Sequence, residues 1–205
     1  MKYIITVQHP QSQHHVNGMV GSWTDWHLTE KGLSQAQAIA NHLSEVIPSD
    51  CSLAIYSSDL KRTKETTQII EKSFDVKPMY LKSLRERNLG KCCGKSVKWL
   101  KENMEKEEFT IDDQLFSDAE SRRDVWERLI PTYHSIMQAE EEWIIIVSHG
   151  DLLAVWNAMF LNLSVEFLNQ ADIFGYAGGI SYMYVDKKGK HIIKQVSDLS
   201  QLEND

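Results

Sequence analysis

The sequence has few cysteines and no long apolar run. Its three cysteines, Cys51, Cys92 and Cys93, are an odd number that includes an adjacent pair, which does not make a disulfide framework. This usage is typical of a reducing compartment, so we expect a cytoplasmic protein. No run approaches the roughly 18 apolar residues that a membrane-spanning helix needs, and the first residues turn polar too soon for a signal peptide. We therefore expect no membrane partner.

An excess of positive charge is also missing. The 22 Lys and Arg residues are outnumbered by 29 Asp and Glu residues, which gives a formal net charge of -7. A net acidic chain without a basic block argues against a nucleic-acid partner. Net charge says nothing about a small basic pocket, so an anionic small molecule is still compatible with this sequence.

No internal repeat or Pro/Ser-rich linker divides the chain. With 205 residues, of which 42% are hydrophobic, the sequence is long enough to bury a sizeable core. We therefore predict a single domain over residues 1–205.

Apolar runs alternate with helical patterns. Runs rich in β-branched and aromatic residues predict strands at 2–7, 53–56, 76–81, 143–147, 180–185 and 192–196. Helical spacing and capping residues predict helices after Thr29, from about 59 to 74, and over 97–106, 120–140 and 151–160, with a possible kink at Pro131. This alternation predicts an α/β fold of three layers, with a mainly parallel central sheet, helices on both faces and an antiparallel hairpin at one edge.

Three of the predicted strands end in residues suited to phosphate. His9 follows the first strand, Arg62 lies one helical turn after the second, and His149 follows the strand at 143–147. The carboxyl ends of parallel strands share one edge of a sheet, and ligands bind at that edge. Imidazoles, a guanidinium and helix amino termini together favour a phosphate ligand. Residues 8–26, which follow the first strand, are predicted as a long polar loop, and such loops are usually functional.

Five ordered segments carry a resemblance to a known family. They are Gln8-His9-Pro10, WTDWHLTEKG at 23–32, SDLKRTKET at 58–66, LRERNLG at 84–90 and VSHG at 147–150. On these segments the chain resembles the histidine phosphatase superfamily, which has the phosphoglycerate mutase-like fold. The resemblance implies that His9 is a nucleophile that forms a phosphohistidine and that Glu86 is the general acid. It also implies that Arg62 and His149 bind the phosphoryl oxygens.

The first motif departs from the family pattern. The family's arginine before the nucleophile is Gln8 here, and its glycine after the nucleophile is Pro10. A hydrogen bond to a charged group contributes about 1.5–3 kcal/mol, so the loss of one charged donor weakens phosphate binding on the order of 10- to 100-fold. Ser12 occupies the family's small hydroxyl position, and His15 falls where the family often has asparagine.

The neighbouring histidines offer a replacement for the missing charge. Protonated His14 or His15 would supply it near neutral pH, and a solvated pair of loop histidines is the alternative. We assign Gln8, Ser12 and His15, with Arg62 and His149, to phosphate binding. His14-His15 and Cys92-Cys93 fit no structural zinc spacing, so we predict no metal and no cofactor.

These observations predict a phosphatase that hydrolyses a small phosphomonoester through a phosphohistidine on His9. One alternative is a non-catalytic or weakly active phospho-ligand-binding protein, because Gln8 replaces the arginine. The other is a phosphoglycerate-type mutase, because both reactions begin with the same half-reaction. The predicted partner is a small phosphorylated metabolite, and the sequence leaves the oligomeric state open.

Overall fold

Within residues 1–202, which the computed structural model describes, six strands form one sheet in the order β3-β2-β4-β1-β5-β6. The strands are β1 (Lys2–Gln8), β2 (Leu53–Ser58), β3 (Met79–Leu81), β4 (Trp143–Ser148), β5 (Ile180–Val185) and β6 (His191–Asp198). Strands β1 to β4 are parallel to one another, β5 is antiparallel to β1, and β5 and β6 form an antiparallel edge hairpin. Residues 203–205 of the predicted domain lie outside the described residues.

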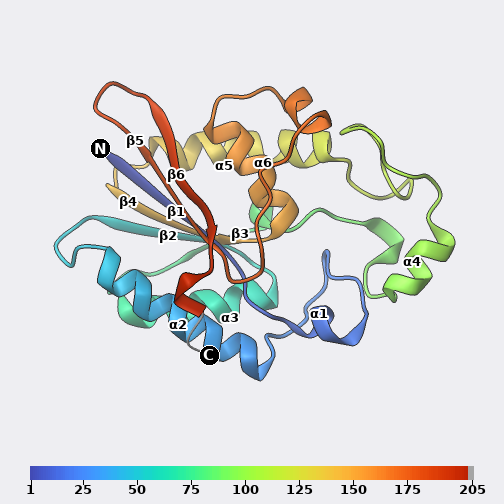
Figure 1. Ribbon diagram of the computed structural model, residues 1–205, viewed down its shortest axis with the longest axis horizontal. Helices are drawn as coiled ribbons and strands as arrows, with labels where there is room; N and C mark the ends of the chain where they lie inside the picture. The colour runs from blue at the N-terminus through green and yellow to red at the C-terminus, as the bar shows by residue number, and fades with distance from the viewer. Residues whose placement is uncertain (203–205) are drawn as a thin grey trace.

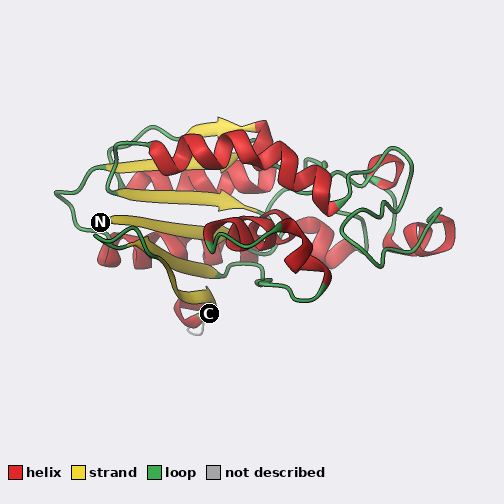
Figure 2. Ribbon diagram, turned by 90° about the horizontal axis from the view of Figure 1, so that it is seen from above, coloured by secondary structure: helices red, strands yellow, loops and turns green. Residues whose placement is uncertain are grey.

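Helices cover both faces of this sheet. The helices that cover it are α2 (Glu30–Val46), α3 (Lys61–Ile70), α5 (Arg122–Gln138) and α6 (Gly150–Phe160), and the described residues also form the short helices α1 (Gln13–Asn17) and α4 (Val97–Asn103). Figure 1 shows α2 and α3 on one face and α5 and α6 on the other, and Figure 2 shows the same layers from above. The predicted α/β fold class is confirmed.

Side chains along the central strands point alternately to the two faces of the sheet and contribute to a hydrophobic core on each face. In β4, Ile144 and Ile146 pack into the core under α5 and α6, while Ile145 and Val147 pack into the core under α2 and α3. Successive side chains of a strand point to opposite faces, and a strand covered on both faces is apolar at every position. This explains why 143–147 is the most apolar strand of the sequence.

Local signals set most element boundaries. The hydroxyl of Thr29 accepts a hydrogen bond from the Gly32 amide at 3.0 Å and caps α2 as predicted. Ser121 and Asp124 form a capping box that starts α5, which continues through Pro131. Strand β3 begins at Met79, later than predicted, because Pro78 has no N–H to donate to a ladder.

The predicted loop over 8–26 contains more structure than expected. Residues Gln13–Asn17 form the one-turn helix α1, which is closed by Gly18 at φ 71°. Isolated bridges join Ser12 to Leu28 and Met19 to Ser96. The two bridges therefore fix the chain on both sides of α1. In Figure 1, α1 and α4 lie beyond the end of the sheet, on the side where β1 ends.

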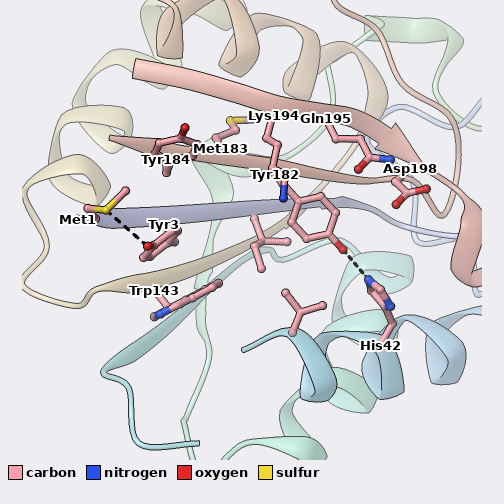
Figure 3. Close-up of a pocket in the computed structure, with 12 residues that line it drawn as sticks. Met1, Tyr3, His42, Trp143, Tyr182, Met183, Tyr184, Lys194, Gln195 and Asp198 are labelled. Carbon is pink, nitrogen blue, oxygen red and sulfur yellow. Dashed lines mark hydrogen bonds between the residues drawn. The ribbon is translucent and has the colours of Figure 1, made fainter. Parts of the chain in front are cut away.

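A cavity of about 560 Å³ lies near the amino-terminal end of β1 (Figure 3). Tyr3 stacks on Trp143 with ring centroids 4.3 Å apart, and the Tyr182 hydroxyl lies 2.7 Å from Nε2 of His42. From Tyr3 to His9 the chain runs the length of β1, about 20 Å at 3.3 Å per residue, so this cavity is remote from the predicted site. Among the described residues, no helix is long and apolar enough to cross a membrane.

Candidate active site

The sheet brings the three predicted strand-end residues together. Gln8 pairs with Ser148 at the ends of β1 and β4, so His9 and His149 follow at the same level. Their ring centroids are 5.2 Å apart. Arg62, in the first turn of α3 after β2, donates from Nε to Nε2 of His9 at 3.0 Å. All three side chains are buried.

The ring of His9 is held in one tautomer. Its Nδ1 lies 2.9 Å from the carbonyl oxygen of Pro10; a carbonyl can only accept, so Nδ1 carries the proton. Nε2 is then the nitrogen with a free lone pair, and it faces Arg62. Burial, followed by the charge of Arg62, holds the pKa of His9 well below its usual value. A neutral imidazole with an oriented lone pair is the state that a nucleophile requires.

Carbonyl groups of the 8–26 segment position Arg62. Its two terminal nitrogens donate to the carbonyl oxygens of Thr24 and Ser22 at 2.8 and 2.9 Å. Burial lowers the pKa of Arg62 to about 10, so the guanidinium keeps its charge at neutral pH. Ser22 has a φ of 49°, a left-handed backbone conformation that aims its carbonyl at the guanidinium.

Glu86, in the irregular segment 85–89, faces this cluster and lies against the first turn of α6. Its carboxylate accepts from the amides of Arg87 at 2.9 Å, Leu152 at 3.3 Å and Asp151 at 3.4 Å. Burial, followed by the nearby charge of Asp151, nevertheless raises the pKa of Glu86 to about 7. The group can therefore give and take a proton near neutral pH, as a general acid and base must. The Trp23 indole donates to the Glu86 carbonyl at 2.6 Å and fixes this segment.

His149 is oriented from β2. Its Nε2 lies 2.8 Å from the Ser58 hydroxyl, while its buried Nδ1 has no hydrogen-bond partner among the described residues. Burial, followed by the charges of Arg62 and His9, keeps the pKa of His149 well below its usual value. The ring is therefore neutral, and it offers one nitrogen to a ligand.

A cavity of about 250 Å³ opens at this cluster. Its lining residues are Gln8, His9, His14, His15, Ser22, Arg62, Glu86, Gly150, Asp151 and Phe174. A Cβ built on Gly150 would lie 3.3 Å from Nε2 of Gln8 and 2.9 Å from the Phe174 ring, so α6 approaches both closely. Gln8 thus reaches the cavity from the end of β1.

The residues in and next to α1 that the sequence analysis considered for phosphate binding differ in their positions. His14 and His15 line the cavity, whereas Ser12 is buried behind them and places its hydroxyl 2.7 Å from Nδ1 of His14. The role of Ser12 as the amino-terminal cap of α1 explains this position. Burial, followed by His15 and then Arg62, lowers the pKa of His14 to about 3, and burial and Arg62 lower that of His15. Of the two alternatives, a charge supplied by His14 or His15 is therefore not favoured near neutral pH.

The same histidines form the one group among the described residues that satisfies the geometry for a metal. Ligand atoms of His9, His14 and His15 lie within 4.8 Å of one another. The guanidinium of Arg62 donates to Nε2 of His9, and its positive charge repels a cation. The donor set therefore suits an anion better than a divalent ion.

Two lining residues carried little signal in the sequence. Asp151 directly follows His149-Gly150, so its place beside the second histidine could have been read from the motif. Phe174 lies in an irregular segment, and no pattern around it indicates a site. Only the packing of that segment against α6 reveals its position.

Comparisons with known proteins agree with this geometry. The sequence model of the histidine phosphatase superfamily (branch 1) matches residues 4–197. The chain is 30% identical to a metal-independent phosphoserine phosphatase from Arabidopsis thaliana, over 98% of this chain and 83% of that protein. It is 27% identical to a 2,3-bisphosphoglycerate-dependent phosphoglycerate mutase from Bartonella tribocorum, over 88% of this chain and 90% of that protein.

The fold has close structural counterparts as well. The solved structure of Bacillus stearothermophilus YhfR matches with a TM-score of 0.84 at 25% identity, over 99% of this chain and 100% of that one. The resemblance first seen in five short segments therefore extends along the whole sheet and its helices. The chain belongs to the histidine phosphatase superfamily.

Proposed function

We propose that this protein is a phosphatase that hydrolyses a small phosphomonoester through a phosphohistidine on His9. The observation that carries the proposal is the orientation of His9, whose Nδ1 is tied to the Pro10 carbonyl while Nε2 faces Arg62 at 3.0 Å. A related phosphatase and the match to the family model over residues 4–197 support it. The proposed phosphate ligands are Arg62, His149, Gln8 and His15, with Ser12 acting through His14.

In the first half-reaction, Nε2 of His9 attacks phosphorus and the bond from phosphorus to the alcohol oxygen breaks. Glu86, protonated near neutral pH, gives its proton to the departing oxygen. The Arg62 Nε–H, which donates to the His9 lone pair, turns to a phosphoryl oxygen, and the Nδ1–H of His149 donates to another. Charge on the transferring group is thus stabilised by positioned donors.

In the second half-reaction, water attacks the phosphohistidine. The Glu86 carboxylate takes a proton from that water, the bond from phosphorus to Nε2 breaks, and inorganic phosphate leaves. His9 returns with its lone pair and Glu86 returns protonated, so the cycle closes. Every proton transfer is assigned to a group in the described site, and we propose that the reaction needs no metal ion or cofactor.

A binding protein of low activity is the second candidate, and Gln8 is the observation that favours it. A carboxamide beside the phosphoryl group donates hydrogen bonds without charge, and neither His14 nor His15 is charged near neutral pH. The site then holds one permanent cation, Arg62, among its described lining residues. Phosphate would still bind, and turnover would be slow.

We also propose that residues 1–205 form one catalytic domain that works in a reducing, cytoplasmic setting on a small phosphorylated metabolite. The free thiols of Cys51, Cys92 and Cys93 support the setting.

Rapid quench with a ³²P-labelled aryl phosphate tests the proposal. We expect label on the protein that is stable in base and lost in acid, because a phosphoramidate differs from a serine ester in this way. The label should be absent from His9→Ala, and turnover should persist in EDTA. Label retained by His9→Ala removes His9 as the nucleophile. Turnover that EDTA abolishes and zinc or magnesium restores contradicts the metal-free mechanism.

A further inference from the structure

Two arginines that line the cavity next to the active-site cavity converge on one carboxylate at the opening between the two. Asp151 lines the cavity beside Glu86. Nε of Arg87 lies 3.2 Å from the Asp151 carboxylate, and a terminal nitrogen of Arg122 lies 3.2 Å from the same group. The two guanidiniums would otherwise be the natural ligands for a second anionic group on a substrate.

Each of these arginines is held by a further carboxylate. Arg87 donates two hydrogen bonds to Glu108, at 2.7 and 3.1 Å. Arg122 lies 2.7 Å from Asp172. Two positive charges therefore face three negative charges, and the side chains involved are at most 35% exposed. The opening has one negative charge in excess, in a place where solvent screens it incompletely.

The other cations near the opening are already paired with carboxylates. Among the described residues that line this cavity and the neighbouring one under Glu108, Arg62 is the cation without a carboxylate partner. Arg62 belongs to the phosphoryl position. A substrate with a second anion would have to displace a paired carboxylate or lie beside the excess negative charge, and both cost binding energy.

Phe174 adds an apolar surface at the same opening. Its ring packs on Gly150, and the side chain is 49% exposed. Phe174 is one of the lining residues of the active-site cavity, so part of its apolar surface is available to the alcohol group of a bound ester. An apolar or aromatic alcohol group would cover this ring.

We infer that the site selects phosphomonoesters whose alcohol part is apolar and carries no second anionic group, with a cationic group preferred over a neutral one. This inference rests on the proposed function of the same site. It also separates the protein from phosphoglycerate-type mutases, because a phosphoglycerate carries a carboxylate next to its phosphate.

Three aryl esters with nearly the same phenol test the inference: tyramine O-phosphate, 4-ethylphenyl phosphate and the phosphate of 3-(4-hydroxyphenyl)propanoate. We expect kcat/KM at pH 7 to be highest for the cationic ester and lowest for the anionic one, with a ratio of about tenfold or more between them. Asp172→Asn removes one negative charge and should lower this ratio about threefold or more. Glu45→Gln makes the same change in net charge on the exposed side of α2 and should leave the ratio unchanged.

Binding of the matching benzylphosphonates to the natural protein, measured by calorimetry, reports the charge preference without turnover. The same order of affinities supports the inference, even if no ester is hydrolysed, and in that case the proposed function alone fails. Anionic compounds that bind or react as well as cationic ones overturn the inference. A ratio that Asp172→Asn does not change overturns the assignment of selectivity to these carboxylates.

Discussion

At the scale of single residues, Gln8 is the main departure from the family pattern. It stands at the end of β1, lines the phosphoryl cavity and packs close to Gly150 and Phe174. The neutral state of His14 and His15 means that neither replaces the missing guanidinium in the unliganded site. The identity of residue 8 should therefore set how tightly an oxyanion binds.

Gln8→Arg should raise the affinity for vanadate and kcat/KM for aryl phosphates, each by about 10- to 100-fold, since a hydrogen bond to a charged donor contributes about 1.5–3 kcal/mol. Gln8→Met keeps the length of the side chain without its donors and should lower both quantities. Vanadate inhibition constants measure the effect. Unchanged constants in both variants would place Gln8 outside the phosphoryl contacts.

Glu86→Gln removes the proton that the leaving alcohol needs. We expect the rate of the first half-reaction, measured as single-turnover phosphorylation of His9, to fall about 10²- to 10⁴-fold for an alkyl phosphate and much less for 4-nitrophenyl phosphate, because nitrophenolate leaves without protonation. In the natural protein the rate for alkyl esters should decline as the pH rises through about 7, where Glu86 loses its proton. Rate profiles for both esters from pH 5 to 9 give this comparison. Equal losses for the two esters would assign the acid role to another group, with Asp151 the first to examine.

At the scale of elements, the short helix α1 places two histidines over His9. Ring centroids of His9 and His15 are 5.5 Å apart and those of His9 and His14 are 5.8 Å apart. The chain then returns through Gly21, where an added Cβ would lie 2.8 Å from Cδ2 and Nε2 of His14. The absence of a side chain at Gly21 therefore decides where His14 sits.

Gly21→Ala should displace the His14 ring and weaken vanadate binding by about threefold to tenfold, an effect in the range of one neutral hydrogen bond. The double variant Gly21→Ala, His14→Ala should be no worse than His14→Ala alone, because neighbours that act through one contact are not additive. Vanadate inhibition constants of the natural protein, the two single variants and the double variant complete this double-mutant cycle. Additive losses would show that Gly21 acts on some other group.

At the scale of the whole molecule, folding buries imidazoles that must stay neutral. His9 and His149 have strongly lowered pKa values, and the pKa of His14 falls to about 3. In the unfolded chain these groups bind protons near pH 6.5, so below that pH the unfolded state binds more protons and stability falls. The effect of Glu86 on stability has the opposite sign. Its pKa is raised, so proton binding favours the folded state as the pH falls from about 7 toward 4.5. Three imidazoles lower the free energy of unfolding as the pH falls and one carboxyl raises it, so the net effect of acid is a loss of stability.

The free energy of unfolding should therefore fall between pH 6.5 and pH 5 by about 2–3 kcal/mol per pH unit, since each such group contributes about 1.4 kcal/mol per unit. His14→Gln should reduce this slope by about one such contribution. Urea unfolding at pH 5, 6 and 7 measures it. Stability that is constant or greater at pH 5 would contradict the burial of neutral histidines.

The sequence by itself determined the order of elements and the main participants. The period-two and helical patterns gave the strands and helices, because burial of one face or both faces leaves its mark at fixed spacing. The strand-end positions of His9, Arg62 and His149 gave their convergence, because parallel strands end at one edge. Boundaries such as the start of β3 were predicted less well, and α1 was read as loop, since a single helical turn leaves no periodic signal.

Tertiary structure decided the protonation states and the environment around those residues. Neutral His14 and His15, the Ser12 hydroxyl turned to His14, and the pKa of Glu86 near 7 all follow from burial and from charges distant in sequence. The carboxylates that occupy Arg87 and Arg122 come from three separate segments of the chain. Desolvation and Coulomb interactions depend on distances in space, so a one-dimensional pattern of residue types contains the groups that react but not the charge that they carry.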